Sequence, residues 1–402
     1  MSKLEQLINE LCPNGVEFKK IKNSYTRIKG TPITAGKMKE IASDDGEIKI
    51  FAGGKTVITA HEADIPNANI TRVPAVLVQS RGVIDAVYYD KPFTFKNEMW
   101  AYTADNPIKV KYLYYVLKNN IEHFREAASG MGSLPQISLR VTEDFIIPLP
   151  PLPVQEEIVR ILDKFTELTT ELTTELTARK QQYEYYSESL LNFKEEYDCK
   201  KIKLKEICDI YLGLTATPKY TNSGVKFISA QNTSKDFLDL ENVKYISEID
   251  YAKATSNAKP KRGDILFTRV GSNLGHPVII DTDEKLCIFV SLGFLRIKNK
   301  NIVSNSYLKH WMNTDLFWSQ VRKKVFGAAK VNLNTGWLKE FELTLPPIDI
   351  QEKIVNHLDC FEKYFNFLYD DLSLEIEARQ KQYEYYRDKL LTFKKKEAAE
   401  NE

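Results

Sequence analysis

Cysteine, histidine and long apolar runs are scarce in this sequence of 402 residues, and each scarcity excludes a class of protein. The five cysteines are odd in number and widely spaced, which argues against a disulfide framework, and the five histidines do not complete a zinc site. The longest uncharged apolar stretch, near residues 145–155, contains four prolines and is far shorter than the roughly 20 residues of a membrane-spanning helix. The first residues lack an apolar secretory core, so we expect a cytoplasmic protein. Together with the short apolar stretch and the scattered cysteines and histidines, this predicts a chain without a membrane segment or a bound metal.

Signatures of catalysis are missing as well. The segment Gly53-Gly54-Lys55-Thr56 resembles the end of a phosphate-binding loop, but Lys49 stands where the first glycine should be. His61-Glu62 has no second histidine four residues after the first, and no Asn-Pro-Pro-aromatic methyltransferase signature occurs. We therefore expect a non-catalytic chain that binds no cofactor of its own.

The chain contains an internal duplication. Residues 150–159 (PPLPVQEEIV) return as residues 346–355 (PPIDIQEKIV), and residues 178–186 (ARKQQYEYY) return as residues 378–386 (ARQKQYEYY). A repeat of about half the chain indicates two copies of one module and not a solenoid of short units.

Each copy ends in a long helical pattern that follows the prolines. Apolar residues recur at steps of three and four through both segments, which is typical of a coiled-coil seam. The residues expected in this seam, and so in spacing or partner binding, are Leu168, Leu172, Leu176, Tyr183, Tyr186, Leu368, Leu372, Ile376, Tyr383 and Tyr386. The tyrosines could instead stack on nucleic-acid bases, but helical spacing favours packing.

Two mixed α/β domains precede the helices. Short β-prone runs such as residues 76–78, 265–267 and 278–280 lie between Gly, Pro and Asn turns. The resulting boundaries are residues 1–149 for the first domain, 150–198 for the first helix, 199–345 for the second domain and 346–402 for the second helix. Arg81 and Arg269 each follow a β-prone run, and we interpret them as matching positions.

Charge is divided between the domains and the helices. Lys and Arg minus Asp and Glu gives 19 − 17 = +2 for residues 1–153 and 23 − 15 = +8 for residues 199–349, against 5 − 11 = −6 for residues 154–198 and 9 − 12 = −3 for residues 350–402. The domains are therefore the expected place for a polyanion, and the acidic helices are better suited to protein partners. Solvated glutamates on the helix surface are the alternative explanation of the helix charge.

Basic and polar side chains near turns are the candidates for DNA contact, because guanidinium groups fork onto guanine and amides pair with adenine. They are Lys55, Gln79, Ser80, Arg81, Gln231, Asn232, Thr268, Arg269, Ser272, Asn273, Arg322, Lys323, Lys324 and Lys330. Each has a simpler alternative: arginines pair with carboxylates, small polar residues cap turns, and charge runs are solvated faces.

The sequence resembles the specificity subunits of type I restriction-modification enzymes along its whole length. The resemblance rests on residues 11–18 (LCPNGVEF), the two proline-led helix openings and the two Tyr-Glu-Tyr-Tyr helix ends. It implies an α/β (α+β) fold of two globular target recognition domains joined by two long antiparallel coiled-coil helices, with pseudo-twofold internal duplication. The implied partners are double-stranded DNA, two modification (methyltransferase) subunits that bring S-adenosylmethionine and methylate adenine, and restriction subunits that cleave DNA with ATP and Mg.

A tetrad repeated three times, residues 166–177 (TELT TELT TELT), is also shared with this family. Each tetrad adds about 6 Å of helix, so tetrad number should set the gap between two half-sites. A low-complexity coil is the alternative, since threonine is β-branched.

Two other functions of the whole chain stay open. The first is a fused methyltransferase or nuclease, which would bind its cofactor without a partner, and the second is a coiled-coil scaffold, which would not bind DNA.

Overall fold

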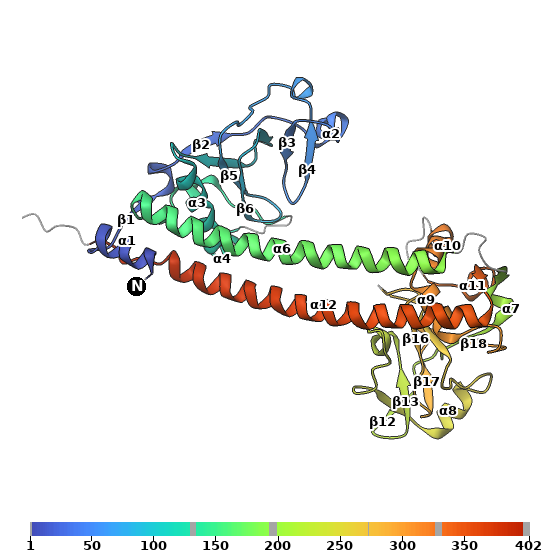
Figure 1. Ribbon diagram of the computed structural model, residues 1–402. Helices are drawn as coiled ribbons and strands as arrows, with labels where there is room; N and C mark the ends of the chain where they lie inside the picture. Colours follow the sequence, from blue (N-terminus) through green and yellow to red (C-terminus); the bar gives the residue numbers. More distant parts are fainter. Residues whose placement is uncertain (1, 129–133, 193–198, 272, 326–331, 397–402) are drawn as a thin grey trace, which may run out of the picture. The chain divides into compact units, whose positions relative to one another are not determined.

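The computed structural model describes residues 2–128, 134–192, 199–271, 273–325 and 332–396, and its chain divides into two compact units. Unit 1 comprises Met1–Thr173 with Leu374–Glu402, and unit 2 comprises Thr174–Ser373. Two long helices, α6 (Leu152–Leu191) and α12 (Ile348–Leu390), each contribute a segment to both units (Figure 1). Both helices begin within two residues of the predicted boundaries, but the compact units cut through them, so each unit is a domain together with parts of both helices.

The first domain is built on an antiparallel sheet in the order β2-β8-β5-β6, with α3 packed on β5 and β6. A smaller sheet, β4-β3-β7, contains a parallel pair, and β1 pairs with β9. The strands are β1 (Glu17–Lys20), β2 (Thr26–Lys29), β3 (Ile48–Phe51), β4 (Val57–Ala60), β5 (Ala75–Gln79), β6 (Asp85–Tyr89), β7 (Phe93–Phe95), β8 (Trp100–Thr103) and β9 (Ile146–Leu149). The helices are α1 (Lys3–Leu11), α2 (Ala35–Ile41), α3 (Pro107–Asn119), α4 (Ile121–Glu126), α5 (Leu139–Glu143) and the 3-10 turns η1 (Ile21–Asn23) and η2 (Glu62–Asp64).

The second domain repeats this plan. Its main sheet has the order β11-β18-β15-β16, its smaller sheet is β12-β14-β13-β17 with a parallel β13-β17 pair, and β10 pairs with β19. The strands are β10 (Lys200–Lys203), β11 (Cys208–Leu212), β12 (Tyr220–Thr221), β13 (Val225–Ile228), β14 (Lys244–Ile246), β15 (Ile265–Thr268), β16 (Pro277–Ile279), β17 (Leu286–Ile288), β18 (Leu292–Ile297) and β19 (Glu342–Leu345). The helices are α7 (Leu204–Ile207), α8 (Glu248–Ala254), α9 (Asn305–Met312), α10 (Asp315–Val325), α11 (Thr335–Lys339) and the 3-10 turn η3 (Ala230–Thr233).

The proline-led motif fixes the start of each long helix in the same way. The buried Gln155 donates its Nε2 to the carbonyl of Pro150 at 2.8 Å, and Gln351 does the same to Pro346 at 2.8 Å. A helix does not continue through these prolines towards the N-terminus, so the proline carbonyl before the first turn lacks a helical backbone donor. The glutamine side chain supplies that donor. The repeated Pro-Pro and Gln letters are therefore explained by local backbone geometry.

A tyrosine at the equivalent position of each domain hydrogen-bonds to the strand that precedes the long helix. The hydroxyl of Tyr112 in α3 donates to the carbonyl of Pro148 at 3.2 Å, and that of Tyr307 in α9 donates to Thr344 at 3.1 Å. Both rings are fully buried in the core shared by domain and helix. Burial raises the pKa of both phenols, which stay neutral donors.

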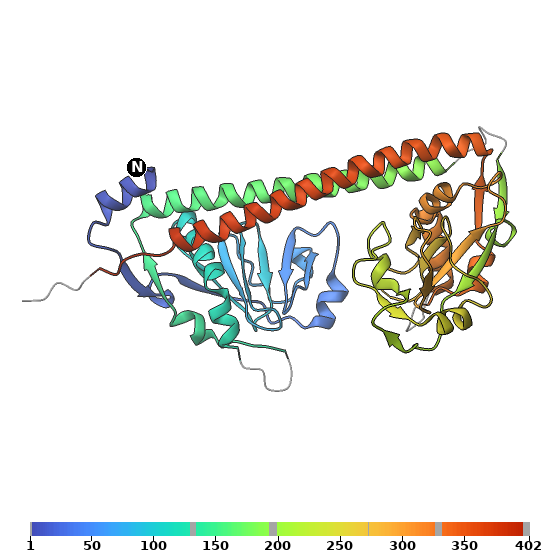
Figure 2. The same ribbon diagram turned by 90° about the horizontal axis from the view of Figure 1, so that it is seen from below.

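Within each unit the segments of α6 and α12 lie side by side (Figures 1 and 2). Aromatic rings pack between them. In unit 2, Tyr183 stacks on Phe365 with ring centroids 4.8 Å apart, and Tyr186 stacks on Phe361 at 5.9 Å. Moving forward along α6 means moving backward along α12, so the pair is antiparallel. In unit 1, Tyr386 stacks on Phe165 at 5.5 Å. The tyrosines pack between helices, as the helical spacing favours.

The predicted seam is only half-buried, as expected for a pair of helices with no further layer. Eight of its residues are intermediate in exposure, and Tyr186 and Tyr386 are exposed. The threonine tetrads are helical throughout, and the hydroxyl of Thr170 donates to the carbonyl of Thr166 at 2.8 Å. Bonds of this kind to the preceding turn occupy the threonine hydroxyls within the helix. The alternative of an irregular coil over residues 166–177 is therefore wrong.

The segment before β1 closes onto the chain's other end within unit 1. The amide of Val16 donates to the carbonyl of Lys394 at 2.9 Å, and the amide of Lys396 donates back to Val16 at 2.9 Å. Gly15 has a φ of 90°, and a Cβ there would lie 2.4 Å from the Lys394 carbonyl oxygen. Only glycine fits this contact.

None of the helices in the described ranges is long and apolar enough to cross a membrane. All five cysteines are free thiols, and Cys12, Cys208 and Cys287 are buried. Burial raises the pKa of the Cys208 thiol to about 12, so this thiol stays protonated and unreactive.

Candidate nucleic-acid interface

The ends of the equivalent strands β5 and β15 hold the arginines singled out by the sequence, but these arginines are not at matching positions. The carbonyl of Ser80 accepts from Ile137 at 3.0 Å, and the carbonyl of Arg269 accepts from Leu333 at 3.0 Å. One residue later, Arg81 bridges to Gln136 and Val270 bridges to Asn332. Arg269 therefore corresponds to Ser80, and Arg81 corresponds to Val270.

The core confirms this one-residue correction. Val76 and Val78 of β5 face the cluster shared with α6, and in β15 the residues that face the corresponding cluster are Ile265 and Phe267. Side chains alternate along a strand, so a shift of one residue sends a side chain to the opposite face. The expectation that Arg81 and Arg269 match is wrong for this reason.

In the first domain, Gln79 and Ser80 hold neighbouring backbone in place. The buried Gln79 donates its Nε2 to the carbonyl of Gly54 at 3.0 Å, and the fully buried hydroxyl of Ser80 donates to the carbonyl of Glu98 at 2.9 Å. The amide of Gly54 in turn donates to the carbonyl of Arg81 at 3.0 Å. These side chains are placed to position the loop, and we do not propose them as direct contacts.

Arg81 lies at the edge of a hollow of about 380 Å³ in the first domain. Its guanidinium has no ion-pair or hydrogen-bond partner within the described ranges, so the alternative of a carboxylate partner does not hold there. Lys39 and the Lys96–Glu98 ion pair, with 3.0 Å between Nζ and Oε1, line the same hollow. Lys55 is exposed in the nearby turn between β3 and β4. Cations thus outnumber the one carboxylate here.

In the second domain, Arg269 is half-buried, and its Nε is shielded from solvent without an acceptor in the described structure. The neighbouring Thr268 is buried, and its hydroxyl also lacks a partner there. A buried donor without an acceptor is costly and rare, so this pair marks a place that a ligand atom could complete.

The other candidates of the second domain differ in placement. Gln231 and Asn273 are exposed, whereas Asn232 accepts from the Ser229 amide at 3.0 Å and donates to the Asp239 carbonyl at 3.1 Å. Asn232 therefore shapes the η3 turn. Ser272 lies outside the described residues.

The basic run Arg322, Lys323 and Lys324 lies in the last turns of α10, exposed on its surface. The Arg322 guanidinium already pairs with the carboxylate of Asp315. Lys323 and Lys324 have no such partner within the described chain, and they stay predicted phosphate contacts. Lys330 lies outside the described residues.

The structure also assembles a cluster that the sequence does not predict. His310 Nε2 lies 2.7 Å from Asp359 Oδ1, and Lys309 Nζ lies 2.9 Å from Glu362 Oε2. The ligand atoms of His310, Asp359 and Glu362 lie within 4.8 Å of one another. Such a group could hold a metal ion, but the Lys309 ammonium already neutralises Glu362. We therefore interpret the cluster as a set of polar contacts that joins α9 to α12. In unit 1, Tyr115 and Lys111 of α3 both bond to Asp163 of α6, at 2.5 and 2.7 Å, so α3 is also joined to its long helix by polar contacts.

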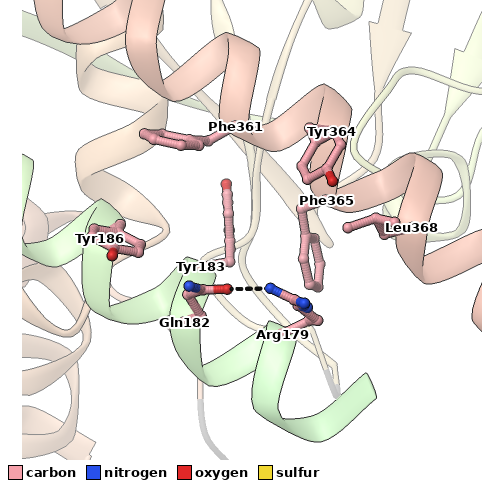
Figure 3. Close-up of a pocket in the computed structure, with 8 residues that line it drawn as sticks. All are labelled: Arg179, Gln182, Tyr183, Tyr186, Phe361, Tyr364, Phe365 and Leu368. Carbon is pink, nitrogen blue, oxygen red and sulfur yellow. Dashed lines mark hydrogen bonds between the residues drawn. The ribbon is translucent and has the colours of Figure 1, made fainter. Parts of the chain in front are cut away.

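An aromatic hollow of about 440 Å³ opens on the helix pair of unit 2 (Figure 3). Phe361, Tyr364 and Phe365 of α12 face Tyr183 and Tyr186 of α6 across it. The ring of Tyr364 is 63% exposed beside this hollow.

Two domains of one topology, carrying different side chains at matched strand ends and fused to long helices, define a duplicated binding protein. The chain belongs to the family described as Type I restriction modification DNA specificity domain, which it matches over residues 17–179 and again over residues 196–378.

Curated relatives agree with this family. The chain is 32% identical over 379 residues to the EcoR124I/EcoR124II specificity subunit of Escherichia coli, covering 89% of this chain and 90% of the relative. It is 33% identical over 314 residues to a putative type I restriction enzyme specificity subunit of Haemophilus influenzae, covering 75% of this chain and 77% of the relative.

Solved structures share the fold at low sequence identity. The crystal structure of a type I restriction-modification S subunit from M. genitalium has a TM-score of 0.54 at 14% identity, covering 94% of this chain and 96% of that one. A structure described in terms of complex assembly and conformational transition of the type I R-M system has a TM-score of 0.56, also at 14% identity, covering 94% and 98%. At this identity the likeness concerns the fold alone.

Proposed function

We propose that this chain is the DNA-recognition subunit of a type I restriction-modification complex and that each domain reads one half of a bipartite target in double-stranded DNA. One observation carries the proposal: the domains share a backbone plan, yet Arg81 is matched by Val270 and Ser80 by Arg269. Equal scaffolds with unequal strand ends suit two different half-sites. The cations at these strand ends suit a polyanion.

The long helices would set the distance between the half-sites and dock two modification subunits. A helix of 40 residues such as α6 is about 60 Å long, which is on the order of one to two turns of duplex DNA. The aromatic hollow at Tyr186, Phe361 and Tyr364 is the surface on which we place a modification subunit in unit 2. Tyr386 and Phe165 make the corresponding stack in unit 1.

In this proposal the chain itself carries no catalytic group and no cofactor. The modification subunits would bind S-adenosylmethionine and methylate adenine, and restriction subunits, where the host has them, would use ATP and Mg. The complex would act in the cytoplasm, where the five thiols stay reduced.

Sequencing of methylated bases in a host with and without this chain tests the proposal. We expect one bipartite motif, with two dissimilar half-sites and a fixed gap, that disappears with the chain. A host methylome unchanged by its removal would contradict the proposal. If the purified complex with modification subunits does not bind DNA, a scaffold function is favoured instead.

A further inference from the structure

The hollow beside β5 in the first domain contains a charged group that the shared scaffold does not need. We propose that Arg81 and Glu98 determine specificity in this domain by reading one G·C base pair, with Lys96 holding Glu98 in position. This inference rests on the proposed function, because it assumes that the first domain meets DNA.

Internal comparison of the two domains separates scaffold from function here. The paired strands align Ala101 of β8 with Phe294 of β18, because these residues pair with Leu77 and Leu266. The same register places Ser291 at the position of Glu98 and Phe289 at that of Lys96.

The second domain therefore replaces all three charged residues of the first, since Val270 stands at the position of Arg81. The two domains nevertheless form the same backbone contact here. In the first domain the amide of Lys96 donates to the carbonyl of Phe51 at 3.0 Å, and in the second the amide of Phe289 donates to the carbonyl of Ile228 at 2.9 Å. Because this backbone arrangement persists without the charges, their presence in the first domain calls for another explanation.

The chemistry of the group fits a G·C pair. An arginine donates two parallel hydrogen bonds to guanine O6 and N7, and a carboxylate accepts from cytosine N4. Arg81 is exposed and has no partner in the described structure, while Glu98 and Lys96 are 27% and 20% exposed and still reachable from the hollow.

The surrounding contacts hold this group in place before DNA arrives. The Ser80 hydroxyl fixes the Glu98 backbone at 2.9 Å, and the Gly54 amide fixes the Arg81 backbone at 3.0 Å. The lining of the hollow also includes the buried Met38 and Ala52. A partly exposed Lys–Glu pair alone contributes little stability, so recognition is the better explanation of its presence.

The test is methylated-motif sequencing of a host whose complex carries R81K, R81Q or E98Q in this chain. We expect E98Q and R81Q to relax a single G·C position in one half-site, with discrimination there falling between about 5- and 150-fold, while the other half-site and the gap stay unchanged. R81K separates the roles of Arg81: lysine keeps a phosphate contact but loses the fork, so R81K should relax the same base as R81Q.

Arg72 and Glu62 provide the matched control, since they form an exposed ion pair of the same residue types in the same domain, at 2.5 Å. R72Q and E62Q should leave the motif unchanged, and thermal unfolding verifies that all variants fold. The inference is overturned if folded E98Q and R81Q retain the full motif, if both half-sites relax together, or if R81K behaves as wild type. Absence of any bipartite motif with the wild-type chain would instead refute the proposed function.

Discussion

Arg269 occupies in the second domain the position that Ser80 occupies in the first. The carbonyl of each accepts a hydrogen bond, at 3.0 Å, from the backbone amide two residues before a short helix, α5 in the first domain and α11 in the second. At this position one domain has a small hydroxyl that fixes its own backbone and the other has a guanidinium whose Nε lacks an acceptor in the described structure. At this one position, the two copies of the scaffold thus differ in function: Ser80 supports the backbone of its own domain, whereas Arg269 has a donor without an acceptor in the described structure.

Replacing this guanidinium should affect one half-site only. We expect R269A to weaken or relax recognition of the half-site read by the second domain by about 5- to 150-fold, the range of one lost bidentate base contact. Arg262, which pairs with Asp283 at 2.9 Å in the same domain, gives the control R262A. Methylated-motif sequencing measures both variants, and an equal loss at the two half-sites for R269A would contradict the assignment.

The start of α6 should respond to acid through Glu157. This carboxylate is 3% exposed and accepts from Arg160 at 2.6 Å and pairs with Lys3 at 3.0 Å; these cations hold its pKa at about 2, below the ordinary 4.5. A depressed pKa stabilises the fold above the ordinary value, and this contribution is lost as the pH falls from about 4.5 towards 2.

We therefore expect E157Q to lower the free energy of unfolding by about 1–2 kcal/mol at pH 7, discounted because both cations are largely exposed. The difference from wild type should shrink between pH 4.5 and 2 in urea titrations. The exposed neighbour Glu156 supplies the control E156Q, which should stay close to wild type. A difference for E157Q that is independent of pH would argue for lost packing and against the charge.

The long helices could be predicted from sequence because their periodicity is local and repeated. The steps of three and four and the prolines predicted starts at residues 150 and 346, and α6 and α12 begin within two residues of these positions. The ends are less well predicted, because α6 ends at Leu191 and α12 at Leu390, against expected limits of 198 and 402. The β-prone runs at residues 76–78 and 265–267 also lie in strands, β5 and β15.

The binding surface could not be predicted in the same way, because it depends on register and on contacts between distant segments. Comparing Arg81 with Arg269 by their letters gives an error of one residue, which on a strand reverses the face. Glu98 and Lys96 follow a different strand from Arg81, and only the folded sheet brings them to one hollow. The different charge of the two domains is visible in the linear sequence, but the one-residue offset between Arg81 and Arg269 becomes visible only from the paired strands.

The stack of Tyr183 on Phe365 should couple α6 to α12 in unit 2. A double-mutant cycle of Y183A and F365A should give an interaction energy of about 0.5–1.5 kcal/mol in unfolding experiments, because the rings lie 4.8 Å apart and are tilted by only 17°. Tyr185 and Phe367, each 69% exposed on the same helices, form the control pair. Equal coupling for both pairs would show that the stack makes no specific contribution.

The tetrads of α6 should act as a length standard for the gap between half-sites. Deleting residues 170–173 removes about 6 Å of helix, against about 3.4 Å for each base pair, so the gap should change by one to two base pairs. Four residues are slightly more than one helical turn, so the seam keeps its direction and the domains should keep their half-site sequences. The double variant T170A/T173A is the control, since it removes the hydroxyls that bond to Thr166 and Thr169 at 2.8 Å but keeps the length. Motif sequencing of both variants decides the question: an unchanged gap after the deletion, or a changed gap after the double substitution, would mean that helix length does not set the spacing.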